Sequence, residues 1–91
     1  MEFEWDPEKA EANFQKHGVD FDDAIAIFDW DTLEDEDTRE DFGEVRVRAI
    51  GACAIGILSV IYTMRGDVCR IISARRANRR EQEAYRKAKS G

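Results

Sequence analysis

The sequence predicts one α+β domain spanning residues 1–91, with two N-terminal helices, an antiparallel sheet of three to four strands and a C-terminal helix. Helix-start signals and a helical spacing of apolar side chains occupy residues 6–28, whereas β-branched residues and strand-like alternation dominate residues 45–73. A chain of 91 residues with 43% hydrophobic content can form one modest core, and no Gly-, Ser- or Pro-rich linker divides it. Helices followed by strands are typical of the α+β class.

The first helix is expected to begin directly after Asp6. The Asp6 side chain can cap the helix, and Pro7 suits the first helical position, where no backbone N–H is needed. Gly18 can adopt the left-handed conformation that commonly ends a helix, so this helix should end near Lys16 or His17.

A second, shorter helix is expected to start at Asp20. Phe21, Ala24, Ile25 and Phe28 follow the i, i+3, i+4, i+7 spacing of one helical face. That face is predicted to pack on the core, while the acidic side chains between these positions face water.

The sheet is predicted from residue 45 onward. Residues 30–43 are mainly acidic and polar, so a loop or hairpin is expected there rather than a buried element. In residues 45–50 the alternation places Arg46 and Arg48 together on one face and apolar side chains on the other. Residues 55–64 are apolar on both faces, which predicts a central strand.

A hairpin and a final helix complete the predicted fold. Residues 65–67 form a link too short for a parallel crossover, so residues 68–73 should pair antiparallel with the preceding strand. Asn78 and Glu81 have the spacing of a capping box, in which each side chain bonds the backbone N–H of the other. A last helix is therefore expected to run to Lys87.

Charge is strongly segregated along the chain. The formal net charge of −6 argues against general nucleic-acid binding. However, residues 20–44 hold twelve acidic side chains and a single basic one, Arg39, whereas residues 65–89 hold nine basic and three acidic side chains. A basic face on an acidic protein is typical of a confined anion-binding site, and an ordinary solvated helix face is the alternative.

Several function classes lack their sequence signals. The chain has no metal-ligand spacing, glycine-rich phosphate loop or GxSxG motif, so no metal site and no cofactor are predicted. Cys53 and Cys69 lie in apolar surroundings and are expected to be reduced, packed side chains. The uncharged stretch at residues 49–64 is shorter than the roughly 20 residues of a membrane span, and the acidic N-terminus does not resemble a secretory signal. A cytoplasmic protein without a membrane partner is therefore expected.

Arginines near the last helix are the first candidates for binding an anion. Arg75, Arg76 and Arg79 precede or open that helix, and Arg46 comes from a neighbouring strand. These guanidinium groups could converge on one phosphate through planar, bidentate hydrogen bonds.

His17 and Tyr85 are further candidates, each with a structural alternative. His17 is the only histidine and the first candidate for proton transfer near neutral pH, although it could simply bond the last carbonyls of its helix. Tyr85 lies one turn after Glu81 and could reach toward the arginines or pack on the sheet.

The residues resemble the BrnT family of type II toxins over nearly the whole chain, from Phe3 to Tyr85. The shared positions are Phe3-Glu4-Trp5-Asp6, Lys9, Asn13, Lys16-His17-Gly18-Val19, Phe21, Ala24, Phe28, Gly43-Glu44, Arg46, Ile50-Gly51, Arg70-Ile71-Ile72-Ser73-Ala74-Arg75-Arg76-Ala77, Glu81 and Tyr85. Together these positions are specific to the family, although none suffices by itself.

This resemblance implies a RelE-like fold and metal-independent cleavage of RNA that inhibits translation and growth. It also implies a BrnA-like antitoxin partner, dimeric and DNA-binding, so that the toxin contacts DNA only indirectly. Carried over by position, the catalytic candidates are Arg46, Arg75, Arg76, Arg79, His17 and Tyr85. The RNA-binding candidates are Lys16, Arg48 and Arg80.

The sequence allows alternatives for the role of its acidic segment and for the function of the chain. The acidic density of residues 20–44 departs from the family pattern, and it could serve antitoxin docking or repel RNA enough to restrict the substrates. The competing function is noncatalytic, either a toxin-derived corepressor or a small nucleic-acid-binding interaction module. Such a protein would bind nucleic acid or the antitoxin without forming a product.

Overall fold

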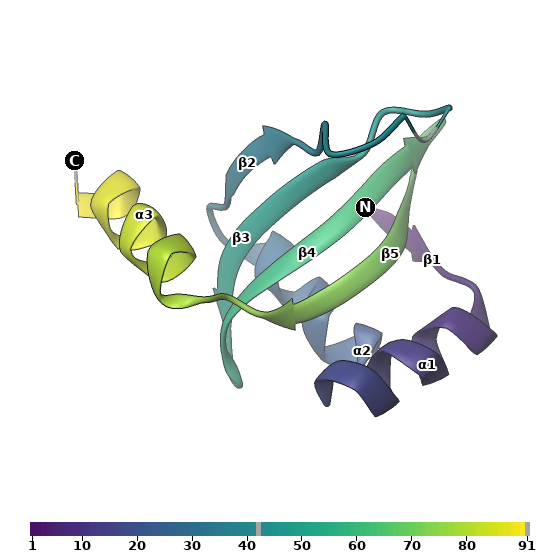
Figure 1. Ribbon diagram of the computed structural model, residues 1–91, viewed down its shortest axis with the longest axis horizontal. Coiled ribbons are helices and arrows are strands. Elements are labelled where there is room, and N and C mark those ends of the chain that lie inside the picture. The colour runs from purple at the N-terminus through teal and green to yellow at the C-terminus, as the bar shows by residue number, and fades with distance from the viewer. Residues whose placement is uncertain (42, 91) are drawn as a thin grey trace.

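The computed structural model describes residues 1–41 and 43–90, which form one five-stranded sheet with helices on its flanks (Figure 1). In chain order the elements are β1 (Glu2–Glu4), α1 (Pro7–His17), α2 (Phe21–Ala24), the 3₁₀ helix η1 (Ile25–Asp29), β2 (Leu33–Glu36), β3 (Val47–Cys53), β4 (Gly56–Arg65), β5 (Val68–Arg76) and α3 (Arg79–Ser90). The strand order is β1-β5-β4-β3-β2. The α+β class and the C-terminal helix are confirmed.

The strand number was predicted too low, because the two outer strands lack the usual signals. β1 has three residues and pairs parallel with the start of β5, whereas all other pairings are antiparallel. Three residues are too few to show alternation. β2 carries the acidic sequence Leu-Glu-Asp-Glu at the sheet edge, within the segment expected to be a loop or hairpin. Acidic, short strands are typical of sheet edges, because they discourage pairing with other chains.

The predicted helix signals act as expected. At α1, the Asp6 side chain accepts a hydrogen bond from Glu8 N at 2.9 Å, and Gly18 closes the helix with φ of 69°. The second helix begins at Phe21, but it tightens into the 3₁₀ helix η1 from Ile25 onward. No helix among the described residues has both the length and the apolar character needed to cross a membrane.

The two faces of the sheet are covered differently. The main core lies between one face and the helices α1, α2 and η1, and its fully buried side chains include Phe21, Ile27, Leu58 and Val60. On the other face α3 packs only at one end of the sheet, where Tyr85 forms a small second core with strand residues. No helix among the described residues covers the rest of this second face (Figure 1).

We call this uncovered part of the second face the open face. It is defined by Arg48 of β3, Ser59 and Ile61 of β4, and Ser73 and Arg75 of β5. Ile61 pairs with both Arg48 and Ser73, and Ser59 pairs with Arg75. Because paired residues of adjacent strands point to the same side, these five side chains share one surface.

Asn13 of α1 replaces a missing strand partner beside β5. β1 pairs only with residues 68–70 of β5, so the β5 edge at Ala74 has no neighbouring strand. The Asn13 amide donates to Ala74 O at 2.8 Å and to Val19 O at 3.1 Å, and its oxygen accepts from Ala74 N at 3.1 Å. These bonds fix the end of α1, with Lys16 and His17, next to the Ser73–Arg75 segment.

We expect Asn13→Ala to lower the free energy of unfolding by about 2 kcal/mol, because it leaves buried backbone groups without partners. Gln15→Ala is the matched control, since Gln15 lies on the same helix and bonds only the exposed Glu11 side chain in the described contacts. Urea unfolding of both variants measures the difference. Equal stabilities for the two variants would contradict the role given to Asn13.

Candidate active site

The open face contains a cavity of about 300 Å³ that gathers most of the polar side chains of this surface. Its lining residues are Lys16, His17, Asp37, Arg39, Arg48, Ser59, Ile61, Ser73 and Arg75. Four of these side chains are cations, one is the imidazole, and one is a carboxylate. Clefts lined mainly by one sign of charge concentrate ligands of the opposite sign, so this cavity is suited to an anion.

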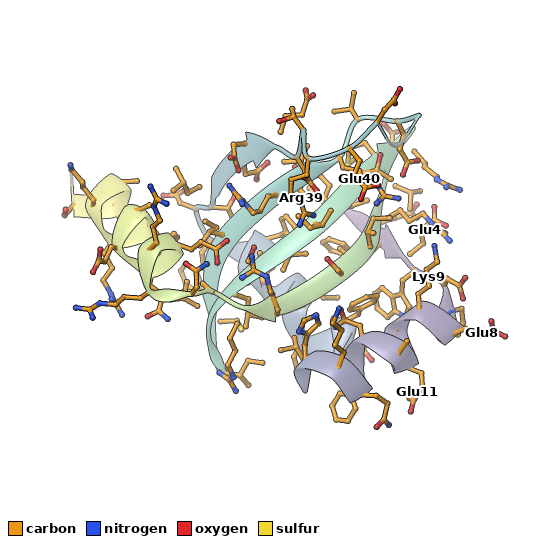
Figure 2. The ribbon with its side chains drawn as sticks, viewed as in Figure 1. Glu4, Glu8, Lys9, Glu11, Arg39 and Glu40 are labelled. Atoms are coloured by element: carbon orange, nitrogen blue, oxygen red, sulfur yellow. The ribbon has the colours of Figure 1, made fainter. Side chains whose placement is uncertain are left out.

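Three parts of the fold supply the four cations and the imidazole. α1 contributes Lys16 and His17 on the β5 flank, the strands contribute Arg48 and Arg75, and the β2–β3 loop contributes Arg39 on the opposite flank. Figure 2 shows Arg39 lying over the sheet rather than at the outer rim of the molecule. The cavity therefore depends on the tertiary fold and not on one local motif.

Arg75 is held in place by Glu81. Its Nη1 and Nη2 donate to the two carboxylate oxygens of Glu81 at 2.7 and 2.9 Å. The predicted capping box is confirmed, because Asn78 N donates to Glu81 at 2.9 Å and Glu81 N donates to the Asn78 side chain at the same distance. The start of α3 thus fixes the direction of the Arg75 guanidinium.

Glu81 is charged although it is only 8% exposed. The hydrogen bond from Arg75 lowers the pKa of Glu81, and the Asn78 N–H and the charges of Arg75 and Arg48 add to this, against the effect of burial. Arg48 approaches Glu81 at 3.8 Å and also pairs with Asp35 of β2 at 2.8 Å. The two strand arginines are therefore preorganised by carboxylates from α3 and β2.

We expect Glu81→Ala to lower the free energy of unfolding by about 2 kcal/mol at neutral pH. The substitution removes a helix cap and leaves the Arg75 guanidinium without its carboxylate partner. A carboxylate with a depressed pKa stabilises the fold above its unfolded pKa, and this contribution is lost as the pH falls through the folded pKa. The difference between wild type and variant should therefore shrink once the pH falls below the ordinary value of 4.5.

Glu83→Ala is the control for this experiment, because Glu83 lies on the same helix and makes a solvent-exposed pair with Arg79. We expect its effect to stay within about 0.5 kcal/mol. Thermal or urea unfolding of both variants measures both effects. A range of roughly four pH units, from about pH 3 to about pH 7, includes the ordinary carboxyl pKa. A pH-independent loss in Glu81→Ala would contradict the account.

The four arginines that could converge on one phosphate do not meet at this cavity, in part because β5 is longer than expected. The strand continues to Arg76 rather than ending at Ser73. Neighbouring residues of a strand point to opposite faces, so Arg75 faces the cavity and Arg76 does not. Arg76 donates instead to the carbonyl of Ile55, and the side chain of Arg79 is 93% exposed.

The remaining predicted residues lie around the cavity rather than in it. Arg46 precedes β3 and pairs with Glu44 at 3.1 Å. Tyr85 packs in the second core, as its structural alternative proposed, and its hydroxyl donates to Asp31 O at 3.4 Å. Arg80 lines a larger neighbouring cavity of about 550 Å³ between α3 and the β2–β3 pair, and Arg48 lines both cavities.

Two charged cavity residues were missed, Asp37 and Arg39. They lie in the acidic segment that was expected to be a loop or hairpin, and no local pattern indicated which way their side chains point. The only available signal was that Arg39 is the single basic residue in that segment.

The cysteines and carboxylates do not form a metal cluster in the part of the chain that the structure describes. Cys69 is buried in the main core, as predicted, and burial raises the pKa of its thiol to about 11. Cys53 is partly exposed, and neither cysteine is in a disulfide.

The cavity brings together side chains whose chemistry suits a phosphodiester. Guanidinium groups bind phosphate oxygens through paired hydrogen bonds, and cations fixed in advance stabilise charge that develops during a reaction. His17 adds an imidazole, a side chain that can accept or donate a proton.

Comparison with known proteins gives a family assignment. No curated protein matches the chain significantly. A family model described as the ribonuclease toxin BrnT of type II toxin-antitoxin systems matches residues 5–81, which is most of the chain. The match includes the C-terminal end of α1, the strands of the open face and Glu81. The chain belongs to the BrnT family of ribonuclease toxins.

Proposed function

We propose that this chain is an endoribonuclease that cleaves RNA in the cavity on the open face, without a metal ion. The observation that carries the proposal is the meeting of Lys16, His17, Arg48 and Arg75 around one cavity, from elements far apart in the sequence. A phosphodiester anion fits this charge, and the family assignment supports RNA as the polymer.

The proposed reaction begins with attack by a 2′-hydroxyl on the adjacent phosphorus. The 2′-oxygen–phosphorus bond forms, the bond from phosphorus to the 5′-oxygen breaks, and a 2′,3′-cyclic phosphate results. The proton of the 2′-hydroxyl must be accepted, and the departing 5′-oxygen must receive one. Both electrons of the broken bond leave with the 5′-oxygen, so no oxidant or reductant is required.

Arg75 and Arg48 are the proposed electrostatic catalysts. A phosphorane-like transition state carries more charge on its equatorial oxygens than the ground state, and fixed cations stabilise that increase. A guanidinium has five N–H donors; the pair with Glu81 occupies two of those of Arg75, and Nη1 also donates to the Arg76 carbonyl at 3.3 Å. Donors therefore remain for phosphate while the carboxylate maintains the orientation.

His17 is the proposed proton-transfer group, and Lys16 beside it is a proposed RNA-binding cation. Arg80 would extend the RNA-binding surface into the neighbouring cavity, next to Arg48. The proposal gives no step in the reaction to the four other candidates, because they do not line this cavity: Arg46, Arg76, Arg79 and Tyr85.

A BrnA-like antitoxin is the proposed partner. We propose that it is a dimeric, DNA-binding protein that neutralises the toxin in the cytoplasm, so that the toxin reaches DNA only through it. The acidic side chains of β2 and the following loop are a proposed docking region, because a DNA-binding partner carries basic surfaces.

The proposal is tested with the purified chain and a defined RNA in EDTA. We expect cleavage into fragments with 2′,3′-cyclic phosphate ends, and no cleavage at a position where the RNA carries a 2′-deoxynucleotide. Expression of the chain alone should stop growth of a bacterial host, and coexpression of the cognate antitoxin should restore it. Binding of RNA without any product would contradict the proposal and favour the noncatalytic corepressor or interaction module.

A further inference from the structure

The β2–β3 loop brings a paired Asp37 and Arg39 to the cavity. Nε and Nη2 of Arg39 donate to the two oxygens of Asp37, both at 2.7 Å, and Arg39 N donates to Asp37 at 3.3 Å. Both residues line the cavity that also contains Arg75. Figure 2 shows the labelled Arg39 in front of the strands of the sheet.

Asp37 forms a fixed support although it belongs to a loop. Its side chain is 4% exposed, and its backbone N–H donates to Arg46 O at 2.8 Å, which ties the loop to the start of β3. The hydrogen bond from Arg39 lowers the pKa of Asp37, and the charges of Arg39 and Arg48 add to this effect. Asp37 therefore stays ionised at neutral pH and can hold a cation.

The Arg39 side chain, unlike that of Asp37, is exposed to solvent. Its side chain is 72% exposed although two of its donors are bound. The bidentate pair uses the Nε edge of the guanidinium, so the two N–H groups of Nη1 and one of Nη2 remain for another acceptor. A phosphate oxygen in the cavity is an acceptor of the correct charge.

We infer that Arg39 is an RNA phosphate-binding residue on the β2–β3 flank of the cavity, and that Asp37 is the positioning residue that aims it. The inference rests on the proposed function, since it assigns a further contact to the same site. Lys16 and His17 bound the cavity on the β5 flank. With Arg39 in this role, the RNA backbone is held from both flanks of the open face.

The two possible roles of Asp37 predict opposite changes in RNA affinity when its charge is removed. If Asp37 acted only through its negative charge, Asp37→Asn would strengthen RNA binding by removing a repulsive group. If it aims Arg39, the same substitution weakens binding. Glu36→Gln is the matched control, because Glu36 is an exposed acid of the adjoining strand β2 that does not line the cavity.

The experiment measures the Kd of a 2′-O-methyl RNA, which cannot be cleaved, by fluorescence anisotropy at several salt concentrations. We expect Arg39→Gln to weaken binding by about threefold to tenfold and to reduce the salt slope by about 0.7, the value for one single-strand phosphate contact. Asp37→Asn should weaken binding as well, and the double variant should be no weaker than Arg39→Gln. Glu36→Gln should bind as well as wild type or slightly tighter.

The outcomes separate the inference from the proposed function. If wild type binds and cleaves RNA but Arg39→Gln keeps its Kd and salt slope, the inference is overturned and the proposed function stands. If Asp37→Asn binds as tightly as Glu36→Gln, the positioning role is overturned. If wild type neither binds nor cleaves RNA, both fall. If circular dichroism shows that Asp37→Asn does not fold, the Kd and salt slope of Arg39→Gln alone test whether Arg39 contacts a phosphate.

Discussion

Arg75→Ala is expected to reduce RNA cleavage by about 10²–10³-fold, the loss typical of removing one preorganised donor from a developing charge. Arg75 is the one residue of the arginine-rich segment whose side chain lines the cavity, and Glu81 fixes its orientation. Single-turnover cleavage of a defined RNA measures the effect on the chemical step. Arg75→Lys should also be impaired, because an ammonium keeps the charge but loses the planar, paired donors.

Arg76→Ala is the matched control for this prediction. It removes the same charge from the neighbouring residue of the same strand, but Arg76 points to the other face and bonds the Ile55 carbonyl. We expect cleavage within about threefold of wild type, as for the loss of a general attraction screened by salt. Equal losses in the two variants would mean that net charge, and not the geometry of the open face, governs activity.

His17→Ala is expected to reduce cleavage by about 10²-fold, because general acid–base catalysis typically contributes at least this factor. His17 is the only imidazole of the chain and lies in the cavity at the end of α1. If it protonates the leaving oxygen, an RNA with a 5′-thio leaving group should restore most of the lost rate, since a thiolate departs without a proton.

Lys9→Ala provides the comparison on the same helix. Lys9 lies in the first half of α1 and does not line the cavity (Figure 2). The Lys9→Ala variant should cleave the ordinary RNA and the 5′-thio RNA at the wild-type rate. A His17→Ala variant that is folded and cleaves ordinary RNA at the wild-type rate would remove His17 from the mechanism, and Lys16 would become the next residue to test.

Local signals account for the parts of the fold that were predicted correctly. The ends of α1 follow from Asp6 and Gly18, and the start of α3 follows from Asn78 and Glu81, because capping depends on residues close in sequence. The β4–β5 hairpin likewise follows from a short link with Gly66 at φ of 60°. β1 was missed because it has three residues and pairs with the distant strand β5, and β2 was missed because its acidic sequence lacks strand signals although it pairs with the next strand, β3.

The site was predicted less completely than the fold, for a related reason. The family resemblance pointed to Lys16, His17 and Arg75, which do meet in the cavity. Whether Arg75 or Arg76 faces that cavity depends on where β5 ends, and strand ends are set by tertiary contacts rather than by local sequence.

The contributions of Asn13 and Arg39 could not be predicted from sequence patterns. Asn13 acts through the backbone of Ala74, 61 positions away in the chain. Arg39 acts through an acidic loop whose path over the sheet is defined only once β2 has paired with β3. Residues that act through such distant contacts leave no periodic pattern for sequence analysis to find.

We propose that RNA occupies the open face between the end of α1 and the β2–β3 loop. Nuclear magnetic resonance titration of the labelled chain with a 2′-O-methyl RNA tests it most directly. We expect the largest chemical-shift changes at the amides of Ser59 and Ser73 and at the Arg75 side chain, with little change at Arg76. Changes confined to the face covered by α1 and α2, or to the outer side of α3, would contradict it.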